Sequence, residues 1–145
     1  MLKGLFIATK EKIRRVVEMA NPENLKYTKE HEWVRMEGDI AVTGITDFAQ
    51  KQLTDIVFVE LPEKGKKAEK GKQLCVVESV KSVSDVFAPV SGEVIEVNEK
   101  LKDSPEMVNK EPYGSGWMAK IKIANKSELN ELMSAKQYEE HTKKG

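Results

Sequence analysis

A β-branched stretch arranged almost symmetrically about one lysine constrains the fold more than any other part of the sequence. The stretch runs from Gln73 to Phe87, and its centre reads Ser79-Val80-Lys81-Ser82-Val83, with a carboxylate beyond each side. Valine-rich segments favour strands, and small residues between two strands favour a tight reversal of the chain. We therefore predict a β-hairpin with Lys81 exposed at its tip. Two rigid strands would present this lysine to a modifying enzyme in one fixed direction.

The remainder of the chain reads as further short strands separated by turn residues, with helices at the margins. An Asp47 cap with Gln50 three residues later predicts a short helix that ends near Leu53. Ser127 is the expected cap of a C-terminal helix over residues 127–133. The predicted strands outside the hairpin are 32–35, 40–45, 56–61, 93–97 and 117–123. The pattern is that of one mainly β domain.

Charge and cysteine content exclude several classes of function. Lys plus Arg and Asp plus Glu number 24 each, so no net charge favours nucleic acid or an anionic membrane. Cys75 is the only cysteine, which excludes an intrachain disulfide and a multi-cysteine zinc site. His31 and His141 are too far apart in sequence to form a metal-binding motif. We expect a reducing compartment and no nucleic-acid, membrane or metal partner.

The hairpin sequence resembles the attachment segment of lipoyl carrier domains. Glu78-Ser79-Val80-Lys81-Ser82, followed by Ala88-Pro89-Val90-Ser91-Gly92-Glu93-Val94, looks like the segment in which that family carries its cofactor. Biotin carriers share the fold but place methionines on both sides of the lysine, where this chain has Val80 and Ser82. The resemblance therefore favours lipoate on Lys81, and avidin binding would identify the biotin alternative.

Segments outside the hairpin narrow the resemblance to glycine cleavage H proteins. The similarity covers roughly residues 25–140 without a large gap. It implies a domain of residues 23–145 with a lipoyl/biotinyl-type fold, a flattened β-barrel or hammerhead-like sandwich with short peripheral helices and a C-terminal helix. The segments that carry the resemblance are Lys26-Tyr-Thr-Lys-Glu-His-Glu-Trp-Val34, Gly44-Ile-Thr-Asp-Phe-Ala-Gln50, Val57-Phe-Val-Glu-Leu-Pro62 and Pro112-Tyr-Gly-Ser-Gly-Trp-Met118.

The resemblance implies a carrier and not an independent enzyme. (R)-Lipoate in amide linkage to Lys81 would accept an aminomethyl group from glycine decarboxylase (P protein) and deliver it to an aminomethyltransferase (T protein). Dihydrolipoamide dehydrogenase (L protein) would reoxidise the dithiol, and a lipoate ligase or lipoyl transferase would attach the cofactor. We expect a monomer, since one exposed arm must visit several enzymes. An alternative on the same attachment is a lipoyl donor or relay to other enzymes.

By the same resemblance, Glu32 and Asp85 are expected to line a cleft in which the loaded arm docks. Such a cleft would exclude water, and carboxylates would suit the cationic amine of the arm. Each residue is equally well explained as a surface carboxylate that caps a turn or pairs with a lysine. Glu78 is expected to act in ligase recognition or to stabilise the turn. Gln52 stands where some relatives have histidine, so any role of that histidine does not carry over.

A different class of function would make Cys75 the nucleophile of an enzyme. No histidine lies near it in sequence, and a cysteine in a β-branched run is usually a small apolar core residue. We therefore expect Cys75 to pack in the core.

Residues 1–22 form an N-terminal extension of different character. Between Met1 and Glu18, five basic and two acidic residues lie among apolar residues at helical spacing, a local charge of +3. The pattern fits a mitochondrial presequence or a membrane-surface helix. It also fits a non-native start, with translation truly beginning at Met19. We expect a cytoplasmic protein of a bacterium, or a mitochondrial one if the stretch is a presequence.

Overall fold

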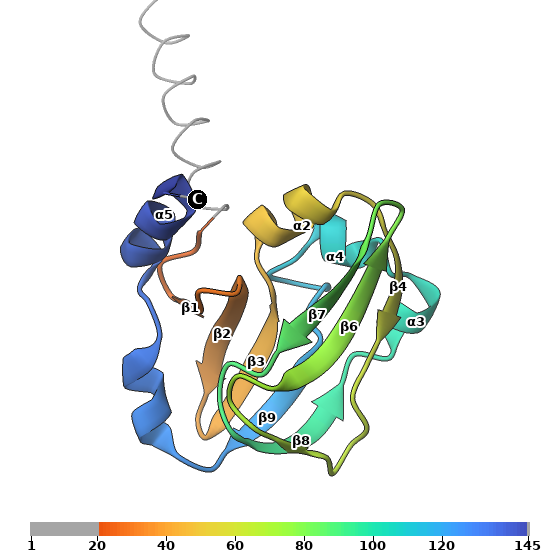
Figure 1. Ribbon diagram of the computed structural model, residues 1–145. Coiled ribbons are helices and arrows are strands. Elements are labelled where there is room, and N and C mark those ends of the chain that lie inside the picture. The colour runs from red at the N-terminus through yellow and green to blue at the C-terminus, as the bar shows by residue number, and fades with distance from the viewer. Residues whose placement is uncertain (1–20, 145) are drawn as a thin grey trace, which may run out of the picture.

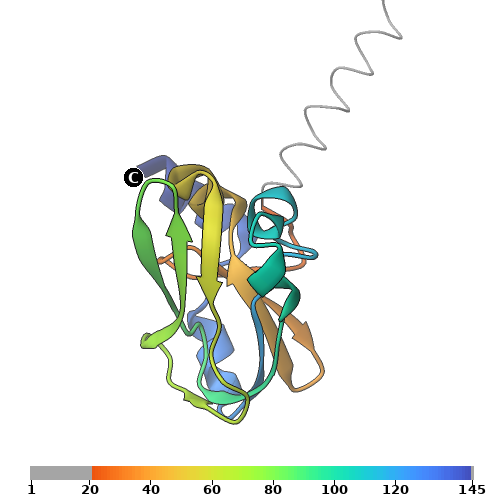
Figure 2. The same ribbon diagram turned by 90° about the vertical axis from the view of Figure 1, so that its right-hand side faces the viewer.

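Two antiparallel sheets packed face to face form the protein (Figures 1 and 2). The computed structural model describes residues 21–144. The larger sheet has six strands in the order β1-β2-β3-β9-β8-β5, and the smaller has three in the order β4-β6-β7. The larger sheet consists of β1 (Lys26–Tyr27), β2 (Glu32–Glu37), β3 (Ile40–Ile45), β5 (Lys67–Ala68), β8 (Gly92–Val97) and β9 (Ala119–Ile123). The smaller consists of β4 (Ile56–Glu60), β6 (Gln73–Ser79) and β7 (Val83–Phe87).

The predicted mainly β sandwich is confirmed, but its sheets do not close into a barrel. In the part of the chain that the structure describes, strands pair only within each sheet, and β4 and β7 remain edges of the smaller one. The core lies between the inward faces of both sheets and contains Val34, Val59, Val77, Val94 and Ile121, each at most 2% exposed. Alternation of apolar and polar residues along the strands buries one face of each sheet.

The predicted hairpin about Lys81 is present as β6 and β7. The two strands pair antiparallel, with Glu78 opposite Val83 and Val77 opposite Ser84. The hairpin tip lies beside α2 (Asp47–Leu53) at one end of the sandwich (Figure 1). The loops between β4 and β6, which carry many lysines, lie at the opposite end.

The helices lie at the margins of the sheets, as predicted, but two of their caps differ from the prediction. Thr46, and not Asp47, caps α2, because the Thr46 side chain accepts a hydrogen bond from the backbone N–H of Ala49. Asp47 is the first helical residue and accepts from the side-chain amide of Gln50. The remaining α-helices are α3 (Lys100–Asp103), α4 (Met107–Lys110) and α5 (Ala135–Lys144).

The C-terminal helix of the predicted fold is present, but it is a separate element after residues 127–133, and the helix predicted over those residues is of a different type. A 3-10 helix, η1 (Lys126–Glu131), occupies this stretch, and Asn125 caps it by accepting from the N–H of Ser127. The true C-terminal helix is α5, which begins after Leu132 and Met133 have packed against the body of the domain. The backbone of Met133 exchanges hydrogen bonds with Tyr27, which ends the 3-10 turn and redirects the chain.

The predictions for the N-terminal extension and for the membrane concern residues that the structure describes only in part. Most of the N-terminal extension, residues 1–20, lies outside the described residues, so its interpretation stays a prediction. Between residues 21 and 144, none of the helices has the length and apolarity needed to cross a bilayer.

Candidate functional site

Lys81 lies in an exposed turn whose backbone is held by one buried serine. The Oγ atom of Ser79 accepts hydrogen bonds from the N–H groups of Lys81, at 3.2 Å, and Ser82, at 3.0 Å. The Ser79 N–H in turn donates to the carbonyl of Ser82 at 2.8 Å. The N–H of Val80 donates to the carbonyl of Asp55 at 3.0 Å and ties the tip to the start of β4. The predicted tip position of Lys81 is therefore confirmed, and these hydrogen bonds hold the turn that presents it.

The amine of Lys81 is directed toward the end of α2. Its Nζ donates to the main-chain carbonyl of Gln52 at 3.2 Å. Gln52 also lines a cavity of about 540 Å³ beside the hairpin. The lysine side chain is exposed and makes no ion pair among the described residues, so the amine is accessible for chemistry beside a residue that lines this cavity.

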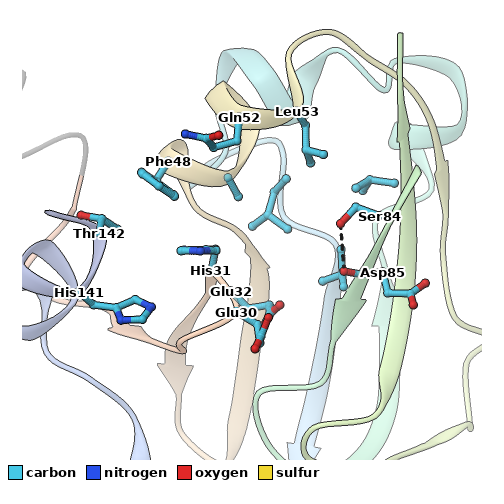
Figure 3. A pocket seen from close by; sticks show the side chains of 14 residues that line it. Glu30, His31, Glu32, Phe48, Gln52, Leu53, Ser84, Asp85, His141 and Thr142 are labelled. Atoms are coloured by element: carbon cyan, nitrogen blue, oxygen red, sulfur yellow. Dashed lines mark hydrogen bonds between the residues drawn. The ribbon is translucent and has the colours of Figure 1, made fainter. Parts of the chain in front are cut away.

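The cavity is lined by six elements, namely β2, β3, α2, β6, β7 and α5 (Figure 3). Its apolar wall comes from both sheets and from α2, and polar side chains gather at its floor and at the α5 side. The apolar residues of the wall are Ile45, Phe48, Ala49, Leu53, Val77 and Val86. A pocket of this size, mostly apolar with a few polar groups, suits a small ligand or a flexible side-chain cofactor.

Glu32 is the carboxylate that the fold places deepest in this region. It is only 2% exposed, and burial raises its pKa to about 7. The Thr28 hydroxyl donates to Glu32 Oε1 at 2.6 Å, and the N–H of Phe87 donates to Oε2 at 3.4 Å. These two donors favour the charged form and oppose the larger effect of burial. Glu32 is therefore an acceptor whose charge changes near neutral pH.

Asp85 also lines the cavity, but its carboxylate points away from that of Glu32 (Figure 3). Side chains alternate along β7, so Ser84 and buried Val86 share the inner face, whereas Asp85 lies on the outer face with Val83. Asp85 Oδ1 accepts a hydrogen bond from the side chain of Gln73 at 2.8 Å. The polar group that β7 presents to the cavity is consequently Ser84, which the alternation of the strand could have indicated.

The two histidines, far apart in sequence, meet at the cavity. The ring centroids of His31 and His141 are 5.8 Å apart, and His31 is 4.8 Å from the ring of Phe48. Burial, followed by the nearby His141, lowers the pKa of His31. No sequence motif could have paired them, because the pairing depends on where α5 docks.

Tyr138 determines where α5 docks. Its hydroxyl lies 2.7 Å from Nδ1 of His31 and 2.7 Å from Oγ1 of Thr46, within hydrogen-bond distance of both. Its ring stacks on that of Tyr27 at 4.7 Å, with only 8° between the planes. The same residue thus joins the C-terminal helix to β2 and to the cap of α2.

The remaining candidates from the sequence lie away from the cavity. Glu78 is exposed and lies between Phe58 and Val83 on the outer face of the smaller sheet. Cys75 is buried, and burial raises the pKa of its thiol to about 12, so the thiol is a core group and a poor nucleophile. Among residues 21–144, no three His, Cys, Asp or Glu side chains are grouped so that they could hold a metal ion.

Comparison with known proteins identifies the family. The model of the glycine cleavage H-protein family matches residues 25–145. The chain belongs to the glycine cleavage H-protein family. As an H protein, it has a lipoyl-carrier role in glycine cleavage.

Individual relatives agree with this assignment. The glycine cleavage system H protein of Symbiobacterium thermophilum is 56% identical over 128 residues, which is 88% of this chain and all of that protein. A probable H protein of Aeropyrum pernix is 52% identical over 122 residues, or 84% of this chain and 85% of that one. The crystal structure of a glycine cleavage system H protein from Mycobacterium marinum matches with a TM-score of 0.78 and 36% sequence identity. The match covers 83% of this chain and 98% of that protein's chain.

Proposed function

We propose that the chain carries (R)-lipoate as an amide on Nζ of Lys81 and shuttles aminomethyl groups between enzymes of glycine breakdown. The observation that carries the proposal is the exposed amine on a rigid turn beside a largely apolar cavity of about 540 Å³. The site fits the group, because an accessible primary amine is needed for the amide and an apolar wall suits the aliphatic arm. When bound, the dithiolane supplies the sulfur chemistry that accepts and releases the one-carbon unit.

The residues of the chain would orient and shelter the arm. Ser79 holds the turn, and Phe48 and Leu53 of α2 line the apolar part of the cavity, where they would limit the access of water to a docked arm. Glu32 at the floor would accept a hydrogen bond from the cationic amine of a loaded arm, and that amine would in turn favour the ionised carboxylate. Ser84 would offer a further hydroxyl from β7.

Asp85 remains a proposed contributor to the cleft. The residue lines the cavity, but its carboxylate lies on the outer face of β7, so it would reach a docked amine only after giving up its hydrogen bond with Gln73 and turning inward. Glu78 faces outward and is better placed for recognition by the lipoylating enzyme than for contact with the arm.

The proposed partners follow from the family. They are glycine decarboxylase, an aminomethyltransferase, dihydrolipoamide dehydrogenase and a lipoate ligase or lipoyl transferase. The chain would act as their substrate, without catalysing a step itself, and we propose that it does so as a monomer in the cytoplasm. The functional domain would be residues 23–145, which agrees with a family match that begins at residue 25.

An intact-mass measurement tests the attachment. Apo-protein is incubated with a lipoate ligase, lipoate and ATP, beside the variant Lys81→Arg. The proposal requires a gain of one lipoyl group in the wild type and none in the variant. A lipoylated Lys81→Arg, or a wild type that stays unmodified, would contradict it.

Reconstitution then separates the two possible duties of the lipoylated protein. With glycine decarboxylase added, an aminomethyl carrier supports exchange of carbon dioxide with the glycine carboxyl group. A lipoylated protein that fails in this exchange but passes its lipoyl group to other enzymes is a relay. A chain that starts at Met19 should behave like the full chain in both assays if the N-terminal extension is dispensable.

A further inference from the structure

Four large apolar side chains are exposed among the described residues, and all four lie around the lysine-bearing tip. Val57 and Phe58 are each 50% exposed, Val80 is 68% exposed, and Val83 is 66% exposed. We call these four residues the apolar tip surface. Single exposed apolar residues are ordinary on a protein, but a contiguous group marks a site of interaction.

The pairing of the strands explains why these side chains lie together. Phe58 of β4 is opposite Glu78 of β6, and Glu78 is opposite Val83 of β7, so the three side chains form one row across the smaller sheet. A register shift between Ile56 and Phe58 leaves Val57 exposed as well. Behind this row, Val59 and Val77 face the core.

Acidic side chains surround the apolar tip surface. Asp55, Glu60, Glu78 and Asp85 are all exposed, and none of them is in an ion pair within the part of the chain that the structure describes. Lys51, on the neighbouring helix α2, is itself paired with Asp47 at 3.0 Å. A partner for this surface should therefore offer apolar groups to Phe58 and Val83 and basic groups to the acidic side chains, including Glu78, which lies between them.

We infer that the apolar tip surface is the docking site of the enzyme that acylates Lys81. The inference rests on the proposed lipoylation of this lysine. A lysine amine extends from its backbone only by a four-carbon stem, so an active site that encloses Nζ must contact the neighbours of Lys81. Enzymes that act on the finished arm reach its ring much farther from the turn, and do not require this contact.

The chemistry of attachment agrees with a docked partner of this kind. The acyl donor is a mixed anhydride of lipoate and AMP, which the partner makes from lipoate and ATP with release of pyrophosphate. The deprotonated Nζ attacks its carbonyl carbon, a C–N bond forms, the C–O bond to the nucleotide leaving group breaks, and the nitrogen loses a proton. The partner must hold the turn still during this attack, and Phe58 extends the contact beyond the hairpin to β4.

Steady-state lipoylation kinetics test the inference. The double variant Phe58→Ser/Val83→Ser is compared with the wild type. The isosteric single variant Val83→Thr and the variant Ile95→Ser are measured beside it. Ile95 is a partly buried residue of β8 in the other sheet and serves as a control away from the tip. We expect KM for the apo-protein to rise about tenfold or more in the double variant and severalfold in Val83→Thr, as for truncated interface residues. The kcat should change little, and Ile95→Ser should match the wild type.

The outcomes distinguish the inference from the proposed function. A wild type that is lipoylated, with an unchanged KM in both tip variants, overturns the docking site and leaves the proposed function intact. A wild type that is never lipoylated overturns both. A thermal unfolding curve for each variant establishes that it is folded, and Val83→Thr, which changes shape least, decides the test if the double variant unfolds. Once lipoylated, the double variant should support glycine decarboxylase at the wild-type KM; a defect found only at this step also overturns the inference.

Discussion

The hydroxyl of Tyr138 lies 2.7 Å from Nδ1 of His31 and thereby attaches the last helix of the chain to the residue directly before β2, the strand that begins with Glu32. Because α5 contributes His141 and Thr142 to the cavity, the wall of the cavity depends on this contact. The arrangement links the C-terminal segment to the site proposed for the arm.

Replacing Tyr138 by Phe should weaken the docking of α5. The variant keeps the stacked ring but leaves His31 and Thr46 without their shared partner, so we expect the free energy of unfolding to fall by about 1–3 kcal/mol. Urea unfolding measures this change. Glu139→Gln, which removes an exposed pair with Lys143, is the control and should change stability by less than about 0.5 kcal/mol. Equal effects of the two substitutions would contradict the assigned role of the hydroxyl.

The stability of the protein should depend on the charge of Glu32. Its pKa is raised to about 7 in the folded state, so its contribution is full below the unfolded value near 4.5 and is lost as pH rises through 7. Relative to Glu32→Gln, the wild type should lose about 1–3 kcal/mol between pH 4.5 and 7 and then level off. Thermal or urea unfolding of both proteins over this range gives the difference. A difference that is constant with pH would show that Glu32 has an ordinary pKa.

Ser79 should be necessary for the rigid turn at Lys81. Ser79→Ala leaves the N–H groups of Lys81 and Ser82 without their acceptor, and we expect a loss of about 1–2 kcal/mol in stability. Hydrogen exchange at these two amides should become faster. Ser82→Ala is the matched control, since the Ser82 side chain is exposed and its contacts in the turn are made by the backbone. Unaltered exchange in Ser79→Ala would rule out the proposed support of the turn.

Gly92 should tolerate no side chain. A Cβ atom at this position would lie 2.0 Å from the carbonyl oxygen of Lys122 on β9, so the two strands would have to separate. We expect Gly92→Ala to lower the free energy of unfolding by at least about 2 kcal/mol. Gly38→Ala, in a turn with φ of 64° and open space around it, should cost only about 1 kcal/mol. Urea unfolding measures both changes, and equal stabilities of the two variants would contradict the predicted clash at Gly92.

The thiol of Cys75 should not react with thiol reagents while the protein is folded. With its thiol buried and its pKa raised to about 12, a thiol reagent should label it only as fast as the protein opens. Cys75→Ala should keep lipoylation and carrier activity at a moderate cost in stability, because the smaller side chain leaves a cavity. Loss of all activity in this variant, with lipoylation intact, would revive the interpretation of Cys75 as a nucleophile.

Local pattern was sufficient to predict the part of the site that is made of neighbours in sequence. The hairpin and the exposed position of Lys81 follow from β-branched segments on both sides of small residues, and the structure confirms both. The boundaries of the last helix were not predictable, because they depend on the bridge between Met133 and Tyr27, which lies more than one hundred residues away along the chain.

The sequence by itself therefore determined the elements and the reactive amine, since these depend on the alternation of residues and on turn chemistry. Only the tertiary structure decided which groups face the cavity. It brought His141 to His31, turned Asp85 outward and Ser84 inward, and buried Glu32 so that its pKa rises. These outcomes depend on how sheets and helices pack on one another, because burial and contact between distant segments arise only when the faces of the elements are fixed.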